Sequence, residues 1–276
     1  MTELTAKAGD SLNTILNTET VDTLSVTLAD GVVFTEKVFI KRDNVIVRSE
    51  KGATIVWNDH NGMVPGFGTA ASATLTISGS NVTLKNITIE NSFDYPRMRA
   101  LRDEGIEKGM GLQAVALFIA PGADSVVLSD CRLLGWQDTL FADGVNNTFE
   151  HCYIKGHVDF IFGRATARFL KCTIESCGVG FVTAPSTREE CPYGMLFEDC
   201  DLIASEGVPE HSVYLARPWH PGGLPGVRSS VRFVNSRLGS HIHPDLWTIM
   251  LDTFKRVRTP EESLFEIDER TRSSLH

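Results

Sequence analysis

A short segment that recurs six times limits the folds open to this chain. Each copy alternates apolar and polar residues, which is the period of a β-strand with one buried face. Aligned, the copies share one slot, which is filled by Ile87, Cys131, Cys152, Cys172, Cys200 and Ser236. One such coil cannot bury its apolar side alone, but stacked coils can. The repeat therefore predicts an all-β chain folded as a parallel β-helix, a solenoid of stacked coils.

The steps between slot residues predict where loops interrupt the coils. They are 44, 21, 20, 28 and 36 residues. We interpret the step of 44, from Ile87 to Cys131, as two coils of 22 residues, and the last two steps as coils with loop insertions. Asn or Asp precedes the slot in four copies, at Asn86, Asp130, Asp199 and Asn235. These residues tolerate turn conformations, so we expect a bend there in each coil.

The repeat covers most of the chain, so we expect a single domain over residues 1–276. A short helix over 11–17, with Ser11 as its N-cap, is expected to close the N-terminal end. The charged tail, 252–276, is expected to pack outside the coil as a helix. The segment 95–111 carries many charges, and we interpret it as a solvated loop. The alternative is that its basic residues meet an anionic polymer.

Charge and hydropathy exclude several classes of partner. The 276 residues carry a net charge of −9, with a pI near 5.4, which argues against nucleic acid. No apolar run reaches about 18 residues, so no membrane span is expected. The first residues lack the apolar stretch of a signal peptide. We expect a cytoplasmic monomer if Met1 is native, and otherwise a secreted protein whose leader has been removed.

The six cysteines do not indicate a metal site or a disulfide framework. Four of them occupy the repeat slot, where each is best interpreted as a small buried residue. Cys177 and Cys191 lie outside it. A disulfide between these two is left open, with free thiols favoured. No cysteine shows the ligand spacing of a zinc site, so no metal is expected.

Two aspartates occupy equivalent positions in consecutive copies of the repeat. Asp138 follows Cys131 by seven residues (138 − 131), and Asp159 follows Cys152 by seven (159 − 152). Stacked parallel strands lie about 4.8 Å apart. If the coils repeat every 21 residues or so, one carboxyl lies over the other, and both face one site.

Two carboxyls at that distance cannot both ionise cheaply, so one pKa should rise. The protonated group then serves as a general acid beside an anion, which suits cleavage of an ester or a glycoside. Candidate partners surround the pair. Gln113 and Gln137 are candidate donors to an oxyanion, and Arg217 could hold the anionic aspartate. Trp136, Trp219, Phe160 and Phe162 are candidate contacts for sugar rings. Each of these residues also has a purely structural interpretation, as a turn, ladder or surface ion-pair residue.

Five stretches around these residues resemble the pectin methylesterases, a carbohydrate esterase family. They are Gln113-Ala-Val-Ala-Leu, Gly135-Trp-Gln-Asp-Thr-Leu, Asp159-Phe-Ile-Phe-Gly, Thr183-Ala-Pro-Ser and Leu215-Ala-Arg-Pro-Trp, in the family's order. The resemblance extends over nearly the whole chain. It implies a right-handed parallel β-helix whose long loops form a substrate groove, and chemistry that needs neither a metal nor a cofactor.

The resemblance also implies a role for each matching residue. Asp159 would attack the methyl ester carbonyl of a galacturonate, and Asp138 would act first as acid and then as base. Gln113 and Gln137 would hold the oxyanion. Arg217 would orient Asp159, while Trp219 would stack on the substrate, which would be pectin or methylated oligogalacturonides.

Two other hypotheses remain from the residues themselves. The same pair of carboxyls could act on a different ester or thioester, or as a retaining glycosidase. The two glutamines favour acyl transfer, because a glycosidase needs no oxyanion hole. The chain could also be a glycan-binding β-helix without activity, although the set of Asp138, Asp159 and Arg217 argues against that.

Overall fold

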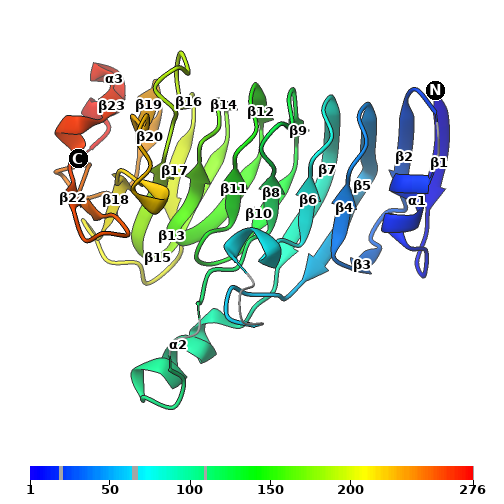
Figure 1. Ribbon diagram of the computed structural model, residues 1–276, viewed down its shortest axis with the longest axis horizontal. Coiled ribbons are helices and arrows are strands. Elements are labelled where there is room, and N and C mark those ends of the chain that lie inside the picture. Colours follow the sequence, from blue (N-terminus) through cyan, green and yellow to red (C-terminus); the bar gives the residue numbers. More distant parts are fainter. Residues whose placement is uncertain (19–20, 64–67, 109–110, 276) are drawn as a thin grey trace.

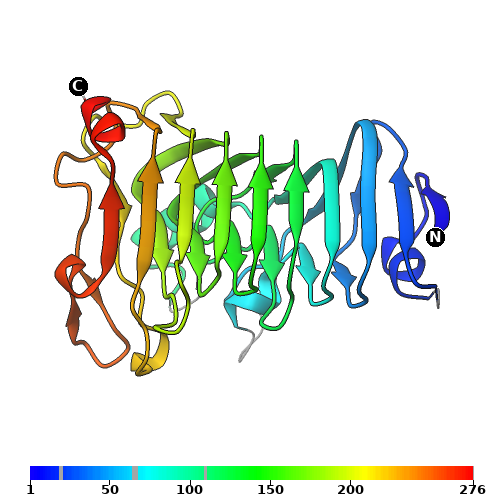
Figure 2. The same ribbon diagram turned by 90° about the horizontal axis from the view of Figure 1, so that it is seen from above.

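The computed structural model describes residues 1–18, 21–63, 68–108 and 111–275. Its strands stack side by side along one axis, with the two termini at opposite ends (Figure 1, Figure 2). A full coil contributes one strand to each of three faces. Among the described residues, every strand pairing in the main sheet is parallel. Antiparallel pairing occurs between β21 (Met250–Leu251) and β22 (Val257–Arg258), and at an isolated bridge between Arg188 and Val227.

The three faces run the length of the stack, and long strands pass from one face to the next. The first face holds β1 (Thr2–Ala6), β2 (Leu24–Leu28), the starts of β5 (Val45–Trp57) and β7 (Val82–Asn91), β9 (Val127–Ser129), β12 (Asn147–Glu150), β14 (Ala167–Leu170), β16 (Met195–Glu198), β19 (Ser230–Val234) and β23 (Leu264–Ile267). The second holds β3 (Val33–Thr35), the ends of β5 and β7, β10 (Arg132–Leu134), the starts of β13 (Tyr153–Gly163) and β15 (Thr173–Pro185), β17 (Asp201–Ala204) and β20 (Arg237–Leu238). The third holds β4 (Val38–Ile40), β6 (Leu75–Ile77), β8 (Leu117–Ile119), β11 (Leu140–Ala142), the ends of β13 and β15, and β18 (Val213–Ala216).

The predicted stacking of the six copies is confirmed. The residues that follow the slot pair in one continuous row, in the order Thr88, Arg132, Tyr153, Thr173, Asp201 and Arg237. The predicted bends before the slot are also present, because Asn86, Asp130, Asp199 and Asn235 all have φ between 51° and 55°. Asn and Asp adopt this left-handed conformation more readily than other residues that carry a side chain.

Aromatic rings and thiols fill the inside of the coils. Phe149, Phe169, Phe197 and Phe233 stack in consecutive coils with ring centroids 4.3–4.6 Å apart, and all four are fully buried. The slot cysteines are buried as expected, and each of three thiols donates to a carbonyl of the coil below. All six cysteines are free, including Cys177 and Cys191.

The interpretation of the 44-residue step as two coils is wrong. Strand β7 pairs directly with β9 and β10, so Ile87 and Cys131 belong to adjacent coils. The extra residues leave the coil in a long excursion that holds α2 (Tyr95–Asp103), which projects from the stack in Figure 1. A loop was expected here. Instead, Asp94 caps a helix by accepting from the Arg97 N–H (3.2 Å), and Pro96 suits its first turn.

The two ends are closed differently. Helix α1 (Leu12–Thr18) lies at the N-terminal end, where Ser11 Oγ accepts from the Thr14 N–H at 3.3 Å. The tail was expected to be a helix outside the coil, but it contributes β23, which pairs with β19, followed by only a short α3 (Glu269–Ser273). The last coil would otherwise leave its apolar side open, and Phe265 and Ile267 of β23 pack against it.

Candidate functional site

Two aspartates lie at the same bend of consecutive coils, where the second face turns into the third. Asp138 lies two residues before the start of β11, and Asp159 lies within β13. Both have left-handed backbones, with φ of 65° and 50°. The Asp138 N–H donates to the carbonyl of Val158 at 3.1 Å, which joins the two bends. One aspartate therefore lies over the other, at the spacing of neighbouring strands.

An arginine from the second coil after that of Asp159 binds the Asp159 carboxylate. Arg217 follows β18, and its Nε and Nη2 donate to the two carboxylate oxygens of Asp159 at 2.8 Å and 2.5 Å. Its guanidinium also lies 3.9 Å from the centroid of the Phe181 ring. A fork of two parallel bonds fixes the plane of the carboxylate.

Asp138 lies in a different electrostatic environment. Its side chain is buried, and burial raises its pKa well above the ordinary value. The negative charge of Asp159 raises it further, while Arg217 and a hydrogen bond from Gln137 partly oppose the shift. The two carboxyls thus differ in their surroundings: Asp159 is paired with the Arg217 guanidinium, whereas burial favours the protonated form of Asp138.

Both aspartates line a pocket of about 440 Å³. The predicted Gln113, Gln137, Asp138, Asp159, Phe162, Arg217 and Trp219 line it, together with Gly68, Thr69, Ala70, Phe141, Ala184 and Met250. The two glutamines lie on adjacent coils, because the Ala114 N–H donates to the Gln137 carbonyl at 3.1 Å. Their interpretation as residues one coil apart therefore agrees with the structure.

An aromatic row borders this pocket, and it includes two residues, Phe118 and Phe141, that are not among the candidates from the sequence. Phe118, Phe141 and Phe162 stack on consecutive strands of the third face, at 4.7 Å and 4.3 Å between centroids, and Trp219 lies edge-on to Phe162 at 5.5 Å. A signal for Phe141 was present in the sequence, since it follows Asp138 by three residues just as Phe162 follows Asp159.

Two predicted substrate contacts lie elsewhere. Phe160 is fully buried in the core of the coil, so it cannot touch a ligand. The left-handed turn at Asp159 resets the strand alternation and sends the next side chain inward. Trp136 packs against Tyr95 and His157, with ring centroids 5.9 Å and 5.8 Å away, and lines a neighbouring hollow instead of the pocket with the aspartates.

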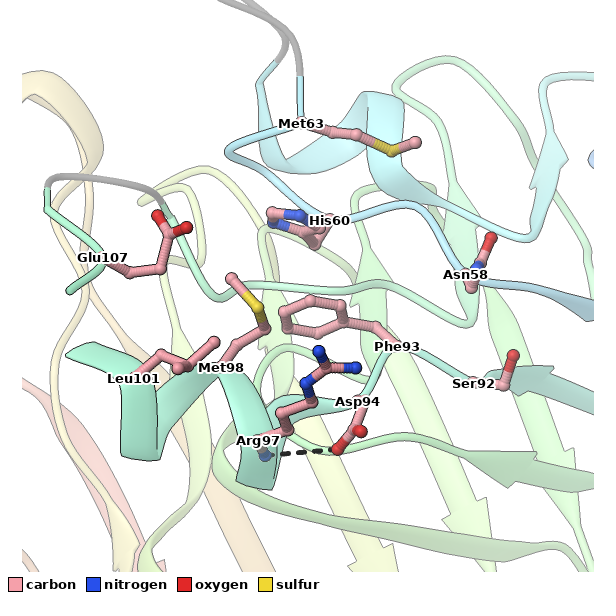
Figure 3. A pocket seen from close by; sticks show the side chains of 10 residues that line it. All are labelled: Asn58, His60, Met63, Ser92, Phe93, Asp94, Arg97, Met98, Leu101 and Glu107. Carbon is pink, nitrogen blue, oxygen red and sulfur yellow. Dashed lines mark hydrogen bonds between the residues drawn. The ribbon is translucent and has the colours of Figure 1, made fainter. Parts of the chain in front are cut away.

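A further hollow, of about 490 Å³, lies at the root of α2 (Figure 3). His60 and Phe93 stack at its centre, with centroids 4.2 Å apart, and Arg97 lies beside them. Two acidic side chains, Asp94 and Glu107, also line this hollow, so its lining carries both signs of charge.

Comparison with known proteins agrees with this geometry. A family model described as Pectinesterase matches residues 8–256. The chain is 33% identical to Pectinesterase A of Dickeya chrysanthemi, over 87% of this chain and 73% of that protein. It is also 33% identical to Pectinesterase 31 of Arabidopsis thaliana, over 72% of this chain and 61% of that one.

Solved structures resemble it closely. A pectin methylesterase in complex with a hexasaccharide superposes with a TM-score of 0.88 at 30% identity, covering 96% of this chain and 87% of that one. A pectin methylesterase from Yersinia enterocolitica gives a TM-score of 0.85 at 31% identity, covering 93% and 88%. The match over most of the sequence and the shared parallel β-helix lead to one conclusion: the chain belongs to the pectinesterase family.

Proposed function

We propose that this protein hydrolyses methyl esters of galacturonate residues in pectin or methylated oligogalacturonides and releases methanol. The observation that carries the proposal is the division of labour in the aspartate pair. Arg217 holds Asp159 as a carboxylate, while Asp138 stays buried with a raised pKa. Membership of the family and the likeness to a pectin methylesterase bound to a hexasaccharide support the choice of substrate.

The proposed reaction has two steps. A carboxylate oxygen of Asp159 attacks the ester carbonyl carbon, and the amide groups of Gln113 and Gln137 stabilise the oxyanion. Asp138 gives its proton to the departing methoxy oxygen, so methanol leaves and an anhydride joins Asp159 to the galacturonate. Water then attacks the galacturonyl carbon of the anhydride while Asp138 takes up a proton. The Asp159 carboxylate is released, and the new acid loses its proton to solvent.

The predicted sugar contacts fit this assignment in part. We propose that Trp219 and Phe162, which border the pocket, contact the substrate, and that Phe141 joins them. Among the described residues, no helix is long and apolar enough to cross a membrane. The monomeric state stays a prediction. The relatives and the fold give no support to a cytoplasmic location.

Methanol release tests the proposal. The substrates are highly methylated pectin and methylated trigalacturonate, and the variants are Asp159→Asn and Asp138→Asn. We expect kcat to fall on the order of 10⁴-fold or more in Asp159→Asn, as for the loss of a nucleophile. Asp143→Asn is a matched control, because Asp143 is buried and paired with Arg164 at 2.6 Å but does not line the pocket.

The outcomes separate the alternatives. Methanol from the wild type and from Asp143→Asn, but not from Asp159→Asn, supports the esterase and its nucleophile together. New reducing ends without methanol would favour a glycosidase. If folded wild type released neither, the pocket would act on a different ester.

A further inference from the structure

The amide of Gln113 has two ends, and only one of them is useful in the proposed reaction. Its NH₂ group can donate to an oxyanion, whereas its carbonyl oxygen would repel one. Rotation of the amide by half a turn exchanges these two ends. The reaction therefore needs a partner that holds the carbonyl end of Gln113 away from the ester.

Asn61 is in the position to do this. Its Nδ2 donates to Oε1 of Gln113 at 3.1 Å, and an amide nitrogen can only donate. Within the described ranges, the side-chain amide of Gln113 has no other hydrogen-bond partner in the protein. Its NH₂ group can therefore donate to a ligand in the pocket, which Gln113 lines. We infer that Asn61 is a positioning residue that fixes the orientation of the Gln113 amide, an inference that rests on the proposed function.

Asn61 is itself held in place. Its backbone N–H donates to the main-chain carbonyl of Gln113 at 2.8 Å. Its side-chain Nδ2 also donates to Thr69 Oγ1 at 3.1 Å. The preceding residue, His60, stacks on Phe93, as Figure 3 shows, and its Nδ1 lies 3.0 Å from the Gly111 carbonyl oxygen. These contacts tie the segment that carries Asn61 to the segment that carries Gln113.

The backbone between the two amides is shaped for their contact. A Cβ at Gly111 would lie 2.6 Å from Gln113 Oε1 and 2.9 Å from Asn61 Nδ2. Both distances are shorter than atoms of these kinds can approach without bonding. Glycine at this position therefore leaves the space in which the amide of Asn61 meets that of Gln113.

Steady-state methanol release from methylated trigalacturonate tests the inference. Gln113→Ala should lower kcat by about 10²-fold, as for the loss of one oxyanion donor. Asn61→Asp should lower kcat comparably, because a carboxylate accepts from the NH₂ of Gln113 and turns its carbonyl toward the ester. Asn61→Ala, which frees the Gln113 amide and also removes the bond to Thr69, should cost about 10-fold in kcat with little change in KM.

A double-mutant cycle distinguishes positioning from a general structural role. If Asn61 acts through Gln113, Asn61→Ala should cause no further loss in the Gln113→Ala background. Asn58→Ala is the control, since Asn58 is exposed on the same loop and should keep the wild-type kcat.

Two results would overturn the inference alone: losses that multiply in the double variant, or wild-type kcat in Asn61→Asp. Absence of methanol from folded wild type would instead overturn the proposed function, and this inference with it.

Discussion

Phe160→Ala tests whether this ring supports the core or touches the substrate. The side chain is fully buried inside the coil. Truncating a buried phenylalanine costs about 3–5 kcal/mol. Unfolding of 276 residues at about 2.1 cal/mol/K each gives an entropy of about 0.6 kcal/mol/K. The melting temperature should therefore fall by about 5–9 °C, while KM for a methylated oligogalacturonide stays near the wild-type value.

The assay combines thermal unfolding followed by circular dichroism with steady-state methanol release. Trp219→Ala serves as the comparison, because Trp219 is only half-buried and lines the pocket. We expect it to raise KM with a smaller change in melting temperature. The reasoning fails if Phe160→Ala raises KM several-fold and leaves the melting temperature unchanged, since that is the behaviour of a substrate contact.

Three other predictions follow from the geometry. The kcat/KM value should fall at high pH, because activity is lost once Asp138 loses its proton. The raised pKa of Asp138 should place this fall well above pH 4, which is about where an ordinary aspartate titrates. A fall near pH 4 would contradict the assignment. Burial lowers the pKa of both His157 and His241 to about 4. As pH falls from about 6.5 toward 4, the unfolded chain binds protons that the folded chain does not. The free energy of unfolding measured in urea should therefore fall by a few kcal/mol over this range, and the fall should be smaller in His157→Gln. Gly156→Ala should prevent folding, because its Cβ would lie 2.3 Å from that of Phe160 and 2.6 Å from the Trp136 carbonyl oxygen; a soluble variant with wild-type circular dichroism would show that the coil can give way.

The repeat could be predicted from the sequence because it depends on local chemistry. The alternation of apolar and polar residues, the small slot residues and the Asn or Asp before them specify one coil that recurs, and neighbouring coils then stack. The same argument placed Asp138 over Asp159. The number of coils was predicted wrongly at Ile87 to Cys131, because a spacing of 44 residues fits two coils as well as one coil with an excursion.

The direction of side chains near the bends could not be predicted in this way. Phe160 and Phe162 both follow Asp159 closely, yet one lies in the core and the other lines the pocket. The strand alternation is reset by the left-handed backbone of Asp159, and the pairing of β13 with β15 shifts register between Val158 and Ile161. Trp136 likewise turned toward Tyr95, whose position depends on where the α2 excursion folds back.

The sequence by itself therefore determined the stacked coil, the shared slot and the pair of aspartates, because a period of about 21 residues repeats the same local environment. The tertiary structure decided how the candidate groups reach that pair and which residues hold them in place. Arg217 reaches Asp159 across 58 residues of chain, and Asn61 reaches Gln113 across 52. Such contacts depend on how loops of unequal length return to the coil, and the loop sequences carry no periodic signal from which that path can be read.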